Sequence, residues 1–103
     1  MKKKFILKLM QESLEDRKQI RRKLEENVTF QRYVPYQVKE VFYKLYDASF
    51  EANYELIVHI QKCKYEQYDT NNIVYEKFQD VDEQFLNFCF DLSEWYRIKS
   101  NIL

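Results

Sequence analysis

The chain has 103 residues with no glycine and one proline, and its 17 Lys and Arg balance 17 Asp and Glu. The missing glycine excludes sites that need a glycine-built loop, such as the phosphate-binding loop, the dinucleotide-binding turn and the nucleophile elbow. Zero net charge argues against a wholly basic nucleic-acid binder, and 46% apolar residues are too many for a disordered chain.

Three long helical patterns divide the chain. They run over about residues 2–27, 36–66 and 73–99. Pro35 precedes the second pattern, where its missing N–H leaves no helical hydrogen bond unmade. We therefore predict an all-α fold: a single helical domain over residues 1–103 that forms an antiparallel three-helix bundle. The first break leaves room for a fourth short helix near residues 29–34, capped by Thr29.

The first helical pattern contains the most basic stretch of the chain. Its five basic residues are Arg17, Lys18, Arg21, Arg22 and Lys23. Such a run can bind phosphates, so nucleic-acid binding is the alternative function that the sequence supports. Acidic residues flank the stretch, and Arg21–Glu25 and Arg22–Glu26 are i,i+4 neighbours. Pairs of this kind favour an ordinary solvated helix surface, although Ser13, Arg17 and Arg21 fall on the side expected to face the core.

The second helical pattern carries an aromatic face beside its core stripe. Its members are Tyr43, Tyr46, Phe50 and Tyr54. Two interpretations stay open. The first helix can cover these rings, or they can form a surface for another protein or for a second copy of the chain. Tyrosine suits such a surface because it is large and rigid and has one polar tip.

The third helical pattern predicts how it pairs with the second. Apolar residues recur in steps of four and three from Val74 to Trp95, which is the spacing of a packed helix. A turn centred near Asp69 would place small residues opposite large rings, as close packing requires. The predicted pairs are Ile60 with Phe78, Leu56 with Val81, Ala52 with Phe85, Ser49 with Phe88, Leu45 with Leu92, and Phe42 with Trp95. Asp80, Asp82 and Glu83 are expected on the solvated side.

The two cysteines, Cys63 and Cys89, are in no motif. The predicted register holds them about 20 Å apart along the hairpin, too far for a disulfide. Free thiols fit a reducing, cytoplasmic location. Glu55, His59 and Cys63 share one side of a helix, but a zinc site needs further ligands and the chain has one histidine. We therefore predict no metal, no cofactor and no catalytic residue.

The longest uncharged run, from Gln84 to Phe90, is far shorter than a membrane span needs. The chain is similar in size and composition, but in no motif, to small helical bundles among bacterial toxin- or bacteriocin-immunity proteins and phage-encoded host inhibitors. The sequence therefore predicts a non-catalytic protein that binds another protein, as an immunity protein, an inhibitor or an adaptor does.

Overall fold

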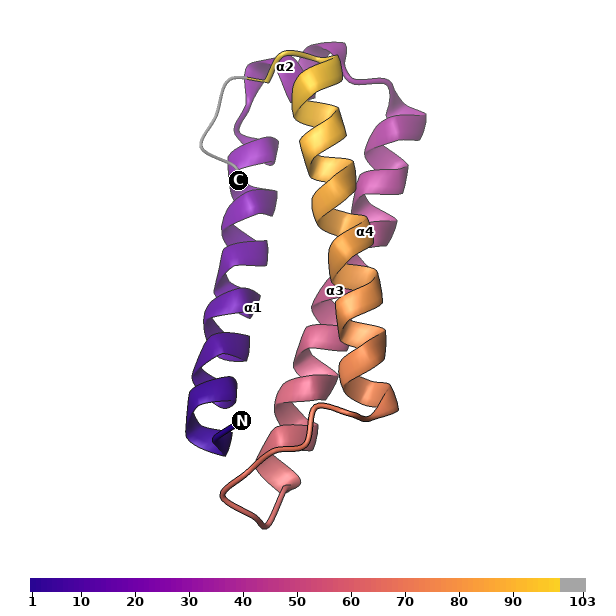
Figure 1. Cartoon of the computed structure of the whole chain (residues 1–103). Coiled ribbons are helices and arrows are strands. Elements are labelled where there is room, and N and C mark those ends of the chain that lie inside the picture. The colour runs from indigo at the N-terminus through magenta and orange to yellow at the C-terminus, as the bar shows by residue number, and fades with distance from the viewer. Residues whose placement is uncertain (99–103) are drawn as a thin grey trace.

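The computed structural model describes residues 1–98, which contain four helices and no strand (Figure 1). The helices are α1 (Lys3–Glu25), α2 (Val28–Tyr33), α3 (Tyr36–Lys62) and α4 (Ile73–Trp95). The predicted all-α fold is confirmed. The molecule is a rod with principal extents of 49 × 21 × 17 Å.

Helix α3 is the central element of the rod. Both α1 and α4 run antiparallel along it, while α2 closes the end where α1 turns into α3 (Figure 1). No Cα atom of α1 lies within 8 Å of a Cα atom of α4. The two outer helices can therefore meet only through their side chains.

The connection between α1 and α3 follows from two residues. The predicted short helix exists as α2, but Asn27 caps it instead of Thr29, because Oδ1 of Asn27 accepts a hydrogen bond from the Phe30 N–H at 3.0 Å. Pro35 disfavours a helical conformation at Val34, and Val34 is extended. The short helix therefore stops there, and α3 begins directly after the proline.

Helix α3 ends at Lys62, earlier than the predicted residue 66, because the chain leaves it to pair with the N-terminal segment. The Lys3 N–H donates to the Glu66 carbonyl at 2.7 Å, and the Tyr68 N–H donates to the Met1 carbonyl at 2.8 Å. The Lys3 ammonium also donates to the Cys63 carbonyl at 2.5 Å, at the end of α3. We call this junction of the N-terminal segment with residues 63–68 the closed end.

Helix α4 ends at Trp95, before the predicted residue 99, which lies outside the described residues. Arg97 has φ 51°, the left-handed conformation that glycine usually supplies after a helix. The N–H of Ile98 donates to the Ser93 carbonyl at 2.9 Å. This is a Schellman motif built without glycine, and it is completed by the buried side chain of Ile98.

Two apolar clusters fill the rod. The cluster near α2 contains Ile20, Leu24, Phe30, Val34, Phe42, Tyr46, Phe85, Cys89, Leu92 and Ile98. The cluster near the closed end contains Ile6, Met10, Ala52, Leu56, Ile57, Ile60, Tyr68 and Phe78. Between them along each helix lie Arg17 on α1, Ser49 on α3 and Asp82 on α4, which we call the central polar layer.

The predicted register between α3 and α4 is wrong. The ring of Phe85 packs against Phe42 and Tyr46, with centroids 5.7 and 5.9 Å away, and not against Ala52. Ala52 is buried, but in the other cluster. Trp95, the predicted partner of the fully buried Phe42, is exposed.

The shift arises in the connection between the two helices. It is no compact turn centred on Asp69, because the chain folds back along the end of α3. There the Tyr68 hydroxyl lies 2.6 Å from Nδ1 of His59. Helix α4 therefore starts beside the last turns of α3, where Lys77 pairs with Glu55 at 3.3 Å.

Candidate functional site

Helix α1 covers much of the predicted aromatic face of α3. The Arg21 guanidinium lies over the rings of Tyr43 and Tyr46, 5.1 and 5.0 Å from their centroids. Tyr46 is only 6% exposed, and the Tyr43 hydroxyl donates to the Glu25 carboxylate at 2.9 Å. Burial, with that hydrogen bond, raises the pKa of Tyr43. These two tyrosines therefore belong to the interface of α1 with α3 and form no common open surface with Tyr54.

The other two predicted residues, Phe50 and Tyr54, line an open groove of about 370 Å³ on α3. We call it the Tyr54 groove; its lining residues are Phe50, Glu51, Tyr54, Glu55 and Val58. The Tyr54 side chain is exposed, whereas Phe50 and Val58 are half-buried. Of the two rim carboxylates, Glu55 pairs with Lys77, and Glu51 has no ion-pair partner within residues 1–98.

Most of the basic stretch 17–23 is engaged within α1. The side-chain contacts are Lys18 with Glu15 at 3.2 Å, Arg21 with Glu25 at 3.5 Å and Arg22 with Gln19 at 2.5 Å. Lys23 is exposed. Neighbours three and four residues apart on a helix surface commonly form such contacts.

Arg17, predicted as part of that stretch, is instead 5% exposed at the centre of the molecule. Its guanidinium forms an ion pair with Asp82 and donates to Oγ of Ser49 at 3.2 Å and to the Ser13 carbonyl at 3.3 Å. Burial lowers the pKa of Arg17. The central polar layer thus ties all three long helices together.

The predicted place of Asp82, on the solvated side of the third helix, is wrong, because its side chain pairs with Arg17 and is only 20% exposed. One signal could have revealed its role: Arg17 occupies a core-facing position of the first helix, and a buried guanidinium requires a counter-ion. A second buried polar group, Asn53, was also missed. Its Nδ2 donates to the Met10 carbonyl at 2.8 Å, which adds a further link between α3 and α1.

Glu55, His59 and Cys63, which were expected to share one side of a helix, do not converge on a common site. His59 contacts the Tyr68 hydroxyl, while Sγ of Cys63 faces the carbonyls of Tyr65 and Gln67 at 3.6 and 3.7 Å. Within residues 1–98, no three His, Cys, Asp or Glu side chains gather as a metal site would require. Both cysteines are free, and they lie in separate clusters, Cys63 at the edge of one and Cys89 within the other.

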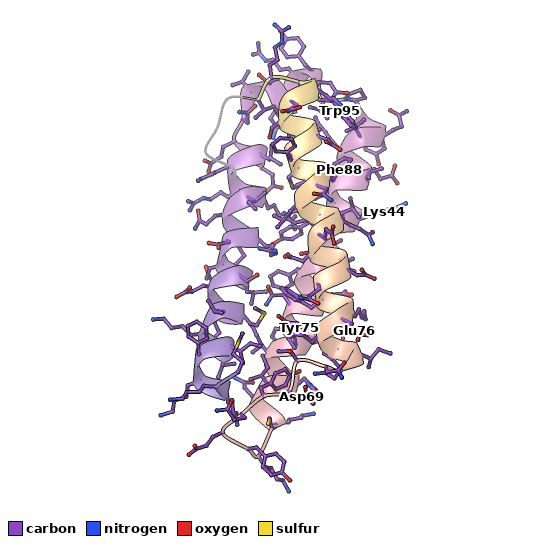
Figure 2. The ribbon with its side chains drawn as sticks, viewed as in Figure 1. Lys44, Asp69, Tyr75, Glu76, Phe88 and Trp95 are labelled. Carbon is purple, nitrogen blue, oxygen red and sulfur yellow. The ribbon has the colours of Figure 1, made fainter. Side chains whose placement is uncertain are left out.

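A wider groove of about 800 Å³ follows α4 and is lined only by residues of that helix. Its carboxylates are Glu76, Asp80, Asp82 and Glu83, and its rings are Tyr75 and Phe78. Tyr75 and Glu76 lie on the first turn of α4, near the closed end (Figure 2). No lysine or arginine lines this groove, so its surface is acidic.

Comparison with known protein families, curated proteins and solved structures finds no match to this chain. No helix within residues 1–98 has the length and apolar character that crossing a membrane requires. Function is therefore inferred from the surfaces described above.

Proposed function

We propose that this protein acts by binding another protein, without catalysis, and that the Tyr54 groove is its contact surface. The observation that carries the proposal is the exposed ring of Tyr54 beside half-buried Phe50 and Val58. Tyrosine is enriched among the residues that dominate binding energy, especially where neighbouring side chains form a pocket. An apolar side chain of the partner would fill the groove next to this ring.

The rim of the groove indicates the charge of the partner. Glu51 has no ion-pair partner among residues 1–98, and Glu55 holds an exposed pair with Lys77. A Lys or Arg of the partner would complement Glu51, and such complementarity speeds association and fixes orientation. The expected partner therefore presents an apolar side chain flanked by positive charge.

The basic stretch gives less support to the alternative of nucleic-acid binding. Arg17 is buried, and Lys18, Arg21 and Arg22 contact side chains of α1. Phosphate binding depends on cationic groups that can exchange counterions for phosphates, and these groups already have partners. Protein binding is therefore the function that we propose.

The free thiols of Cys63 and Cys89 fit a reducing compartment, so we place the interaction in the cytoplasm. Immunity proteins, inhibitors and adaptors of similar size and composition act by such binding. A second copy of the chain is one partner to test. If the partner is a second copy, sedimentation over a range of concentrations should show a monomer–dimer equilibrium. Tyr54→Ala should shift that equilibrium toward the monomer.

Site-specific photo-cross-linking tests the proposal. A benzophenone amino acid replaces Tyr54 or, as a matched control, Tyr36, another exposed tyrosine of α3; their exposed fractions are 58% and 74%. In extract of the producing cells, we expect a discrete protein adduct from position 54 and none from position 36. The adduct identifies the partner for purification.

The purified partner then decides the assignment. Tyr54→Ala should weaken binding at least about tenfold, whereas Tyr36→Ala should leave it unchanged. Both variants should keep the helical spectrum and melting temperature of the parent. An affinity that Tyr54→Ala leaves unchanged, or equal adducts from both positions, would refute the groove as the contact surface.

A further inference from the structure

We infer that the closed end is a docking surface for an anionic membrane, with lysines that attract lipid headgroups and apolar side chains that enter the interface. This function is separate from the Tyr54 groove. It rests on charge, exposure and the backbone contacts that bring two distant segments together.

The backbone joins the start of α1 to the chain after α3. Lys2 forms an isolated antiparallel bridge with Gln67, and the hydrogen bonds of Lys3 and Tyr68 hold the same junction. A pocket of about 390 Å³ lies between the two segments. Its lining residues are Lys2, Lys3, Lys4, Lys64, Tyr65 and Glu66. Lysines that are far apart in the sequence thus share one surface.

Within residues 1–98, carboxylates compensate little of the positive charge of this surface. Three of the lysines that line the pocket, Lys2, Lys4 and Lys64, are exposed, as are Lys8 on α1 and Lys62 at the end of α3. Within residues 1–98 none of the five forms an ion pair, while Lys3 is engaged by the carbonyls at the end of α3. Glu66 is the single carboxylate that lines the pocket. The closed end therefore presents a net positive surface on a chain of zero net charge.

Three exposed apolar side chains each directly follow one of these lysines along the chain. Phe5 and Leu9, one turn apart on α1, are both exposed, as is Tyr65 beside Lys64. Lysines next to Phe and Leu on a helix are typical of elements that lie in the membrane interface. Each lysine near an anionic bilayer strengthens binding roughly fivefold. The exposed apolar side chains strengthen binding further when they move from water into the membrane interface.

The apolar groups favour a membrane over a nucleic acid. A phosphate backbone would use the same lysines, but it would leave Phe5 and Leu9 in water. An anionic bilayer satisfies both sets of side chains at once. The cytoplasmic leaflet of a cell membrane is negatively charged, which agrees with the cytoplasmic location proposed for the protein.

Vesicle co-sedimentation of the full chain tests the charge. We expect binding to phosphatidylcholine vesicles that contain phosphatidylglycerol, no binding to phosphatidylcholine alone, and weakening by added salt. K2Q/K4Q/K64Q should reduce affinity by about a hundredfold. The matched control K18Q/K39Q/K44Q makes the same change of charge away from the closed end and should bind like the parent. K2R/K4R/K64R keeps the charge and should also bind.

A second pair of variants tests the apolar contribution. Phe5→Ala on α1 and Phe90→Ala on α4 remove rings of similar exposure, 56% and 53%. Phe5→Ala should weaken vesicle binding several-fold, and Phe90→Ala should not. Tyr54→Ala should also leave vesicle binding unchanged, which separates this inference from the proposed function.

Tryptophan fluorescence reports which end meets the lipid. The single tryptophan, Trp95, lies at the opposite end of the rod from Asp69 and the closed end (Figure 2). Anionic vesicles should leave its emission unchanged, whereas the F5W/W95F variant should show a shift to shorter wavelength. Helical spectra and melting midpoints like those of the parent establish that each variant is folded.

Three results would overturn the inference. The first is equal binding to neutral and anionic vesicles, or no binding to either. The second is an equal loss in the two triple-glutamine variants. The third is duplex DNA binding that exceeds vesicle binding and does not depend on Phe5, which would assign the lysines to a nucleic acid.

Discussion

Cys89 illustrates how burial controls the chemistry of a single group. It lies in the cluster near α2, where burial raises the pKa of its thiol to about 12, against a partial lowering by the charge of Arg17. The thiolate is the reactive form of cysteine. Because its side chain is also only 1% exposed, we expect Cys89 to react slowly in the folded protein, whereas Cys63 is only partly buried.

Alkaline pH should destabilise the protein through Cys89. Its folded pKa of about 12 exceeds the ordinary value of 9.0, so the folded state binds the proton more tightly. The stabilisation of the folded state by this tighter proton binding is complete below pH 9.0 and is lost as pH rises toward 12. The free energy of unfolding then falls by up to about 1.4 kcal/mol per pH unit. Urea unfolding across this range measures the slope.

Variants of the two cysteines identify the source of that slope. Cys89→Ala should make the slope shallower, and Cys63→Ala should preserve it. Burial also raises the pKa values of Tyr43 and Tyr68, and the alkaline loss that they cause is common to both variants. A slope that Cys89→Ala leaves unchanged would contradict the assignment.

At the scale of the elements, the helices end without glycine. Asn27 and Asn72 cap α2 and α4 by accepting hydrogen bonds from the N–H groups of Phe30 and Tyr75, both at 3.0 Å. Arg97 takes the left-handed position after α4. Side-chain caps and backbone hydrogen bonds at the closed end therefore satisfy N–H and C=O groups at the helix termini. Turns that contain glycine commonly do this in other proteins.

Packing of α3 in the cluster near the closed end is tested at Ala52. This side chain is buried in the cluster that contains Phe78. Ala52→Leu should overpack it and lower the free energy of unfolding by roughly 1–3 kcal/mol. Ala48→Leu adds the same atoms to an exposed position one turn earlier and should change stability by less than about 0.5 kcal/mol.

Chemical denaturation of the two variants gives the comparison. A neutral or stabilising Ala52→Leu would contradict this prediction, because it would mean that the cluster near the closed end has room for a larger side chain at position 52. A large loss in Ala48→Leu would show that the exposed side of α3 is packed against something.

At the scale of the whole molecule, the two outer helices carry opposite charges. Helix α1 has eight basic and four acidic residues, whereas α4 has one basic and six acidic residues. Their backbones stay apart, yet Arg17 and Asp82 form a mostly buried ion pair between them. This pair therefore links the outer helices across the centre of the rod.

Removing one member of the pair should destabilise the fold strongly. Asp82→Ala leaves the Arg17 guanidinium buried without its counter-ion, which typically costs about 3–5 kcal/mol. Asp80→Ala removes an exposed carboxylate from the same helix and should cost less than about 0.5 kcal/mol. Arg17→Met combined with Asp82→Leu should recover most of the loss, because apolar packing often replaces such a pair.

Urea or thermal unfolding distinguishes these variants. Equal stability of Asp82→Ala and Asp80→Ala would indicate that the guanidinium reaches water or another acceptor when Asp82 is absent. Failure of the double variant to recover would indicate that the hydrogen bond of Arg17 to Ser49 is also required.

The helical class and most of the element boundaries follow from the amino-acid sequence alone. Apolar spacing, the missing glycine and Pro35 act over a few residues, so their consequences follow without knowledge of the tertiary structure. The starts of α3 and α4 agree with prediction for this reason. The residue before a proline and the residue that caps a helix are local signals.

Tertiary contacts set the register of α3 with α4, the cover of α1 over Tyr43 and Tyr46, and the pairing of Arg17 with Asp82. Each depends on contacts between segments far apart in the sequence. The early end of α3 has the same origin, because Lys2 pairs with Gln67 across almost two thirds of the chain. Apolar spacing identifies the face that a helix buries. The register of that helix along its partner depends on the path of the connecting chain and on the side chains that meet at the interface.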